Sequence, residues 1–265
     1  MKVEEKDNKG VSRLAIVPVR SYPSDTSEMV TQLLFGDHYT VLESMNEGRW
    51  LKIEINFDEY LGWIDAKQHC PISDVYFNHL NNVNFKICTD ISANLLYNKS
   101  PIQILIGSIL PISSMELFDM EEQLAFNGES HNMGDSMGFD FVKQIALKYL
   151  NAPYLWGGKT PFGVDCSGFV QMVFKISGYK LSRDASEQAL LGTKVEDLES
   201  ALPGDLCYFG TKTKITHVGM LLGDGKIIHA SGQVRIDNIS DQGIHLAVNN
   251  TLTHKLQLIK RVLRN

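Results

Sequence analysis

The chain has 265 residues, of which 43% are hydrophobic and 21% charged, and its formal net charge is −6. This composition is ordinary for a folded globular protein and excludes fibrous and intrinsically disordered classes. The negative balance and the lack of a lysine or arginine run argue against general affinity for nucleic acid or for an anionic membrane, because phosphate binding needs clustered cations. The length predicts two or three domains.

Membrane insertion and export are not predicted. The longest apolar stretch, residues 102–112, is about half the ~20 residues that a membrane-spanning helix needs, and Pro111 interrupts its end. The first twenty residues mix acidic and basic side chains and lack the apolar core of a secretory signal. A cytoplasmic protein is therefore expected, or an exported one if a signal peptide preceded this sequence.

Residues 14–66 are predicted to form short strands joined by turns. Strand formers alternate with polar residues in VTQLL, TVLES and WLKIEI, and turn-forming residues occupy 36–37, 46–48 and 58–59. This pattern indicates a small β-barrel, which we assign to a first domain, residues 1–72.

Residues 73–134 are predicted to form a second, less regular β-rich domain, which could be another barrel of the same kind. Strands are expected over residues 85–98, 100–112 and 114–118. The polar, glycine-rich stretch 127–138 reads as a linker or exposed loop that leads into a third domain, residues 135–265.

The third domain is predicted to be α+β, with helices first and strands afterwards. From residue 139 a helical stripe carries Phe141, Ile145, Ala146, Tyr149 and Leu150, and residues 151–153 end it. A second, amphipathic helix follows residue 165, with a glycine at 178 as its stop signal. Strands are expected over residues 206–210, 217–223, 226–231 and 256–263.

The four cysteines, Cys70, Cys88, Cys166 and Cys207, are too few and too widely spaced for a disulfide framework. A zinc site built from His69, Cys70, His79 and Cys88 fits no common ligand spacing, and buried thiols beside solvated histidines are the alternative. Cys207 lies in an apolar strand and is interpreted as inert core.

Cys166 lies where a glycine-rich loop, residues 157–164, runs into the second predicted helix. A helix N-terminus carries partial positive charge and unpaired N–H groups, which favour a thiolate and hold a developing oxyanion. Asp165 is the expected N-cap. Cys166 is thus a candidate nucleophile, and a small buried hydrophobe is the alternative.

His217 and His229 are candidates for the base that a thiol nucleophile needs. If residues 223–225 form a three-residue hairpin loop, His229 lies opposite Gly219, and the two histidines become diagonal neighbours on one face, roughly 7–8 Å apart at Cα. A two-residue turn at 224–225 would place them on opposite faces. In the first register His217 takes the proton of the thiol and His229 orients the ring of His217; ordinary satisfied strand histidines are the alternative.

The motifs PYLWGGKTPFGVDCSGFVQ, RDASEQ, LPGDLCYFG and THVGMLLGDGKIIHAS resemble the NlpC/P60 cysteine peptidases, in the order of that family and over residues 139–265. The segments SEMVTQLLFGD and GRW followed by EYLGWI resemble a bacterial SH3-type domain. The whole arrangement is similar to the γ-D-glutamyl-L-diamino acid endopeptidases, or dipeptidyl-peptidases VI. The resemblance implies a papain-like catalytic domain, with helices packed on an antiparallel sheet, preceded by one or two SH3-like barrels.

The same resemblance implies hydrolysis of the γ-D-glutamyl to diamino-acid bond in peptidoglycan stem peptides that carry a free N-terminal L-Ala, as in murein recycling. It implies a catalytic triad of Cys166, His217 and His229. The substrate-binding positions that it implies are Glu28, Tyr60, Tyr154, Trp156, Asp165, Ser167, Asp184 and Ser186.

For several of these residues an ordinary structural role is the alternative. Glu28 is equally compatible with a solvated strand position, and Tyr154 and Trp156 with core packing. No metal or organic cofactor is expected, because thiol–imidazole chemistry needs none. Two other functions stay open: a wall-binding protein with an inactive cysteine domain, and an acyltransferase or amidase of the same superfamily.

Overall fold

The computed structural model describes residues 8–82, 85–113, 118–119 and 124–263. Contacts within the chain divide it into two compact units, Met1–Asp135 and Ser136–Asn265. The first seven residues of the segment considered for export, and residues 114–117 of one expected strand, lie outside the described residues. No helix in the described ranges is long and apolar enough to cross a membrane.

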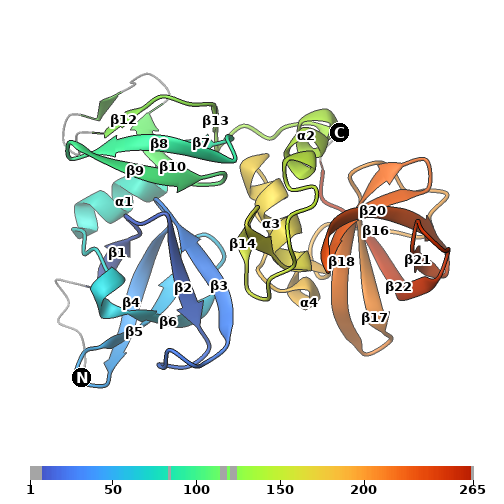
Figure 1. Ribbon diagram of the computed structural model, residues 1–265, viewed down its shortest axis with the longest axis horizontal. Coiled ribbons are helices and arrows are strands. Elements are labelled where there is room, and N and C mark those ends of the chain that lie inside the picture. Colours follow the sequence, from blue (N-terminus) through green and yellow to red (C-terminus); the bar gives the residue numbers. More distant parts are fainter. Residues whose placement is uncertain (1–7, 83–84, 114–117, 120–123, 264–265) are drawn as a thin grey trace. The chain divides into compact units, whose positions relative to one another are not determined.

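A six-stranded antiparallel sheet of order β1-β4-β5-β6-β2-β3 forms the first part of unit 1 (Figure 1). The strand bounds are β1 Lys9–Val11, β2 Ile16–Arg20, β3 Met29–Leu34, β4 His38–Met45, β5 Trp50–Ile55 and β6 Leu61–Asp65. Alternate residues of these strands enclose a core that includes Val17, Leu33, Tyr39 and Ile53. This small barrel confirms the expected SH3-like fold class.

The second part of unit 1 begins with a helix that the sequence analysis missed, α1 Asp74–Asn82. Ser73 caps it, because its hydroxyl accepts the backbone N–H of Tyr76 at 3.2 Å. Phe77 and Leu80, three positions apart, are both buried on one side of the helix. The start of the predicted β-rich block, residues 74–82, is therefore helical.

Two small sheets follow α1, of orders β10-β7-β13 and β11-β12-β8-β9. The strand bounds are β7 Phe85–Cys88, β8 Ser92–Tyr97, β9 Ser100–Leu105, β10 Ile109–Ser113, β11 Phe118–Asp119, β12 Leu124–Phe126 and β13 Ser130–Asn132. Because β13 pairs with β7, the expectation of a linker or loop over residues 127–138 was wrong for residues 130–132.

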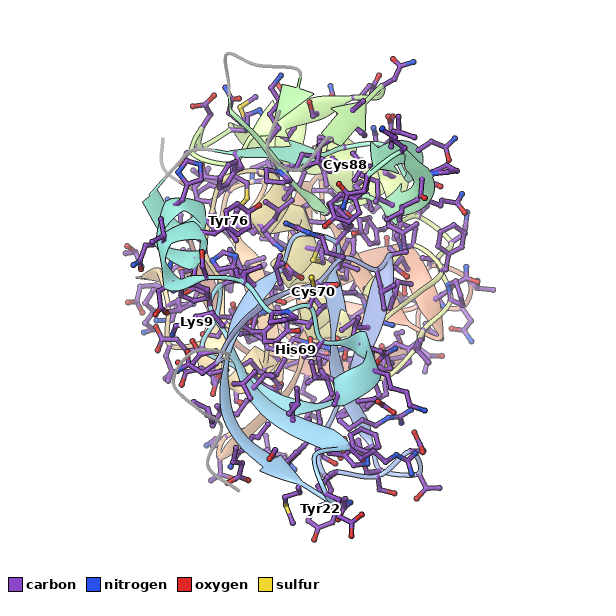
Figure 2. All side chains as sticks on the ribbon, turned by 90° about the vertical axis from the view of Figure 1, so that its left-hand side faces the viewer. Lys9, Tyr22, His69, Cys70, Tyr76 and Cys88 are labelled. Atoms are coloured by element: carbon purple, nitrogen blue, oxygen red, sulfur yellow. The ribbon has the colours of Figure 1, made fainter. Side chains whose placement is uncertain are left out.

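The residues considered for a zinc site belong to different parts of unit 1. Cys70 packs against a core cluster that includes Leu80 and Phe85, whereas Cys88 lies in a separate cluster. Figure 2 shows Cys88 apart from His69 and Cys70. The Nδ1 atom of His69 is hydrogen-bonded to the hydroxyl of Tyr39 at 3.0 Å. Within the described ranges no group of three or more His, Cys, Asp or Glu residues is placed to hold a metal ion.

Unit 2 combines helices with a closed antiparallel sheet, and its helices lie to one side of that sheet (Figure 1). The sheet has the order β16-β22-β17-β18-β19-β20-β21, and a further pairing of β21 with β22 closes it into a barrel. Its strand bounds are β16 Thr193–Val195, β17 Leu206–Thr211, β18 Lys214–Gly223, β19 Lys226–Ser231, β20 Gln233–Ser240, β21 Gly243–His245 and β22 Leu252–Arg261. Two further strands, β14 Lys159–Thr160 and β15 Gly163–Val164, pair with each other in a separate sheet. This architecture confirms the α+β class.

Three helices, α2 Phe139–Lys148, α3 Cys166–Ile176 and α4 Ala185–Gln188, complete unit 2. In α2 the predicted stripe is buried at Ile145, Ala146 and Tyr149, but Leu150 is 39% exposed because the helix has already ended. The helix α3 packs on β18 and β19 and is buried over its whole length, so the polar side of its amphipathic pattern is buried as well. It ends before Gly178, whose φ of +85° fits the predicted stop.

Candidate active site

The N-terminus of α3 is organised around the carboxylate of Asp165, which caps the helix as predicted. Oδ1 accepts the backbone N–H of Gly168 at 2.7 Å, and Oδ2 accepts that of Gly157, in the glycine-rich loop, at 2.8 Å. The hydroxyl of Ser167 donates to Oδ1 at 3.3 Å. One side chain therefore fixes the loop and the helix start on either side of Cys166.

Arg183, which the sequence analysis did not select, supplies the countercharge to Asp165. Its Nη1 atom donates to Oδ1 of Asp165 at 3.0 Å and to the hydroxyl of Ser167 at 2.9 Å, and its Nη2 atom pairs with Oδ2. Both charged side chains are almost fully buried, with 1% and 7% of their surface exposed. Arg183 could have been selected from the sequence, because it is the first residue of the RDASEQ motif.

The β18–β19 hairpin places His217 and His229 on one face, although its turn differs from the prediction. Gly223 pairs with Lys226, so the turn has two residues, Asp224 and Gly225, both with positive φ. A bulge between Leu221 and Gly223 shifts the register by one residue. The bulge restores the predicted pairing of Gly219 with His229, so the expected register is confirmed and the expected loop length is wrong.

The two histidines form a buried hydrogen-bonded chain that continues to an aspartate. The Nε2 atom of His217 lies 2.8 Å from Nδ1 of His229, and Nε2 of His229 lies 3.1 Å from Oδ2 of Asp237 on β20. All three side chains are buried. Asp237 was missed, although QVRIDNIS is a recognisable strand, because a single sequence does not show which strand lies beside β19.

A third imidazole, His254 of β22, was also missed. Its ring stacks on that of His217 with centroids 4.1 Å apart and an interplanar angle of 23°. His254 pairs with Ile244, whose side chain belongs to the apolar core inside the barrel. The barrel interior thus has an apolar part and a polar part that holds the three imidazoles and Asp237.

The thiol of Cys166 lies beside this chain. The backbone N–H groups of Val218, next in sequence to His217, and of Ser167 hydrogen-bond its sulfur. Burial, with a smaller contribution from the charge of Asp165, nevertheless raises the pKa of the thiol to about 11, against the opposing effects of the two N–H groups and Arg183. The N–H groups thus favour the thiolate, as expected, but desolvation outweighs them, so the thiol is held in its protonated form.

The pKa values of the two histidines are also shifted, in the direction that favours the neutral imidazole. Burial lowers the pKa of His217 well below 6.5, and the neighbouring His229 and His254 lower it further. Burial lowers the pKa of His229 to about 4, against the opposing effect of Asp237. A protonated thiol beside a neutral imidazole can transfer its proton at the moment of attack, so the arrangement suits general-base activation of a thiol.

Besides Asp165, three predicted substrate-binding residues lie in the loop and helix around Cys166. Burial raises the pKa of Tyr154 to about 12, with smaller effects from the charges of Cys166 and Asp165, so its hydroxyl is a neutral donor beside the thiol. Trp156 is 60% exposed, so core packing does not account for it. Ser167 is buried and bonded to Arg183.

The remaining predicted residues belong to α4 and its N-cap or to unit 1. Asp184 occupies the N-cap position of α4, and Ser186 is exposed beside a depression lined by residues 211–215. Glu28 and Tyr60 belong to unit 1, where Tyr60 packs against the barrel core. Their roles toward a substrate stay predictions.

Comparison with known proteins identifies the class of this chain. Residues 151–252 match the model of the NlpC/P60 family, and residues 19–68 match that of the bacterial dipeptidyl-peptidase Sh3 domain. The chain thus contains an NlpC/P60 peptidase domain preceded by a bacterial SH3 domain, and the predicted resemblance is confirmed.

Two curated relatives and one solved structure are similar to most of the chain. The chain is 29% identical over 220 residues to a gamma-D-glutamyl-L-lysine dipeptidyl-peptidase of Bacillus subtilis (strain 168), covering 76% of this chain and 71% of the relative. It is 27% identical over 251 residues to dipeptidyl-peptidase 6 of Lysinibacillus sphaericus, covering 83% and 88%. A crystal structure of an NlpC/P60 family protein from Bacillus cereus shares the fold, with a TM-score of 0.79 at 22% identity over 97% of this chain and 100% of that one.

The stacked ring of His254 is expected to influence the pH range of activity. His254→Phe keeps an aromatic face on His217 but removes a group that opposes protonation of His217, so the pKa of His217 rises. If His217 is the base, it must be neutral to act, and the acid limb of kcat/KM should move to higher pH. Peptide hydrolysis measured across the acid range checks this. His245→Phe is the control, since that ring bonds Ser240 and Asn250 instead; a limb at the wild-type position in both variants would contradict the prediction.

Proposed function

We propose that the chain is a cysteine peptidase that hydrolyses the γ-D-glutamyl to L-diamino acid bond of peptidoglycan stem peptides. The observation that carries the proposal is the buried chain from His217 through His229 to Asp237 beside a thiol at a helix N-terminus. The names of two relatives, which are dipeptidyl-peptidases, support this choice of substrate.

In this proposal Cys166 is the nucleophile and His217 the base. The sulfur attacks the γ-carbonyl carbon of D-glutamate while the thiol proton passes to His217. That proton then goes to the leaving amino group of the diamino acid, and the γ-glutamyl thioester remains on Cys166. Water, deprotonated by the same imidazole, hydrolyses the thioester and restores the thiol. His229 holds the ring of His217 in orientation.

The substrate-binding residues of the same proposal are those that the family resemblance implies. Tyr154, Trp156, Asp165, Ser167, Asp184 and Ser186 line the γ-D-glutamyl site. From the domain over residues 1–72, Glu28 and Tyr60 bind the free amino group of an N-terminal L-Ala, since a carboxylate beside an aromatic face suits an ammonium group. The same proposal divides the chain into three domains, over residues 1–72, 73–134 and 135–265. This specificity directs the enzyme to small murein fragments in recycling.

A peptide panel tests the proposal. Wild type should release L-Ala-γ-D-Glu from L-Ala-γ-D-Glu-L-Lys or its diaminopimelate analogue, as read by mass spectrometry. Cys166→Ala should lower kcat at least about 10³-fold, as loss of a nucleophile does in other hydrolases. Cys207→Ala is the matched control, because that thiol is fully buried in the apolar barrel core.

The free amino group is tested separately. Acetylating it should lower kcat/KM by about 10–100-fold, the equivalent of one lost charge-assisted hydrogen bond. Glu28→Gln should remove most of this discrimination, whereas Glu43→Gln, which removes a carboxylate paired with Lys52 on the same barrel, should leave it intact. Equal cleavage of both peptides would contradict the assigned amine site.

Two outcomes would favour other functions. Binding of sacculi without cleavage of any peptide indicates a wall-binding protein with an inactive cysteine domain. Transfer of a group to an added amine, seen as a mass increase other than that of water, indicates an acyltransferase. Cleavage of whole sacculi while the free peptides stay intact would contradict the recycling role.

A further inference from the structure

Asp237, at the end of the histidine chain, is a carboxylate with donors facing both of its oxygens. Its side chain has no exposed surface. Oδ1 accepts the backbone N–H of Ala247 at 2.8 Å and Nη2 of Arg235 at 3.1 Å. Oδ2 faces Nε2 of His229 at 3.1 Å and forms an ion pair with Nε of Arg235 at 2.8 Å. Asp237 is therefore held as an ionised carboxylate with one oxygen directed at His229.

This carboxylate determines where the protons of both imidazoles lie. An ionised carboxylate only accepts, so Nε2 of His229 carries the proton. A neutral His229 then has a bare Nδ1, which accepts from His217, so Nε2 of His217 carries a proton as well. A neutral His217 is left with a bare Nδ1, which is the atom that can take a proton from a thiol.

We propose that Asp237 is a positioning residue that selects the Nε2–H tautomer of both His229 and His217, and so leaves Nδ1 of His217 unprotonated as the base. This inference rests on the proposed function, because it gives His217 the role of base for Cys166. It extends the three-residue site by one member that touches neither substrate nor thiol.

The isosteric substitution Asp237→Asn tests the tautomer directly. The N–H of Ala247 and Nη2 of Arg235 both hydrogen-bond Oδ1, whereas Nε of Arg235 makes an ion-pair contact with Oδ2 but no hydrogen bond. The oxygen of the new amide therefore stays at the δ1 position, and its NH₂ group takes the δ2 position and faces His229. A donor there requires a bare Nε2 on His229. The proton of each ring then moves to Nδ1, and the basic atom of His217 is lost while the rings keep their places.

The control is Asp205→Asn in the same unit. Asp205 is also buried, accepts a backbone N–H from Leu202 at 2.8 Å, and pairs with an arginine, Arg261, at 2.8 Å. Its side chain is hydrogen-bonded by Leu202 and Arg261 and by no histidine. The two variants therefore lose a similar buried carboxylate, and only one of them changes the donor facing an imidazole.

The experiment combines kinetics with nitrogen-15 NMR of labelled histidine near pH 8, in the full chain. In wild type, both rings should show the Nε2–H tautomer. Asp237→Asn should convert them to Nδ1–H and lower kcat by ~10²–10⁴-fold with little change in KM, as a wrong tautomer does in serine proteases. Asp205→Asn should change neither quantity.

The possible outcomes separate the inference from the function on which it rests. A wild-type His217 or His229 in the Nδ1–H form overturns the inference, and this reading needs no variant to fold. An unchanged kcat in Asp237→Asn with converted tautomers overturns it as well. If the tautomers convert as expected but wild type cleaves none of the peptides, the tautomer assignment stands and the proposed peptidase function fails.

Discussion

Arg183→Met is expected to destabilise unit 2 by about 3 kcal/mol. The substitution keeps much of the side-chain volume but leaves the carboxylate of Asp165 buried without its countercharge, and breaking a buried ion pair on one side typically costs about 3–5 kcal/mol. The three other donors to Asp165 compensate in part, which puts the expectation at the lower end. The melting temperature should fall by roughly 10 °C or more, as measured by calorimetry.

Two variants identify the cause of that loss. Arg261→Met breaks a comparable pair with Asp205, but the side chain of Arg261 is 28% exposed, so water compensates and the loss should be smaller. In the double variant Asp165→Asn/Arg183→Met the uncompensated charge is gone, while asparagine still caps a helix well, so part of the stability should return. A double variant no more stable than Arg183→Met would show that lost packing, and not the buried charge, causes the effect.

The local parts of the site could be predicted from the sequence. Asp165 and Cys166 are neighbours at the junction of a glycine-rich loop with an apolar helical pattern, so cap and thiol follow from local rules. The pairing of Gly219 with His229 follows from the hairpin, since the two strands are adjacent in the chain. The exact turn did not follow, because a two-residue turn with a bulge and a three-residue loop give the same register.

The site residues that the sequence analysis missed come together through contacts between distant parts of the chain. His254 reaches His217 because β22 pairs with both β17 and β21 and so closes the barrel, which is a long-range pairing that no local periodicity encodes. Arg183 reaches Asp165 from the loop that precedes α4, eighteen residues further along the chain. The shifted pKa values of Cys166 and the histidines follow from burial, which a single sequence does not quantify.

The helix α1 shows that a local signal can also be overlooked. Ser73 followed by an acidic first turn, with Phe77 and Leu80 three positions apart, is a helix start with an apolar stripe. The surrounding strand patterns favoured a continuous β-rich block, and the short segment was assigned to it. Here the residues carried the information and the interpretation did not use it.

Unit 2 is expected to lose stability as the pH falls from 6.5 toward 4. His229 has its ordinary pKa near 6.5 when unfolded and a pKa of about 4 when folded, so in this window the unfolded chain binds a proton that the folded chain does not. Stability is complete above 6.5 and decreases as the pH falls. At about 1.4 kcal/mol per pH unit, His229 alone accounts for roughly 3 kcal/mol. The lowered pKa values of His217 and His254 act in the same direction.

Hydrogen exchange of the α3 amides, followed by mass spectrometry at several pH values, measures this loss in unit 2 alone, because α3 packs on the strands that carry His217 and His229. After correction for the intrinsic exchange rate, the opening free energy should decline between pH 6.5 and 4. His254→Phe removes one of the three protonation sites and keeps a ring stacked on His217, so its decline should be shallower than that of wild type. An opening free energy independent of pH would mean that the imidazoles titrate alike in the folded and unfolded chain, and that their burial does not hold them neutral.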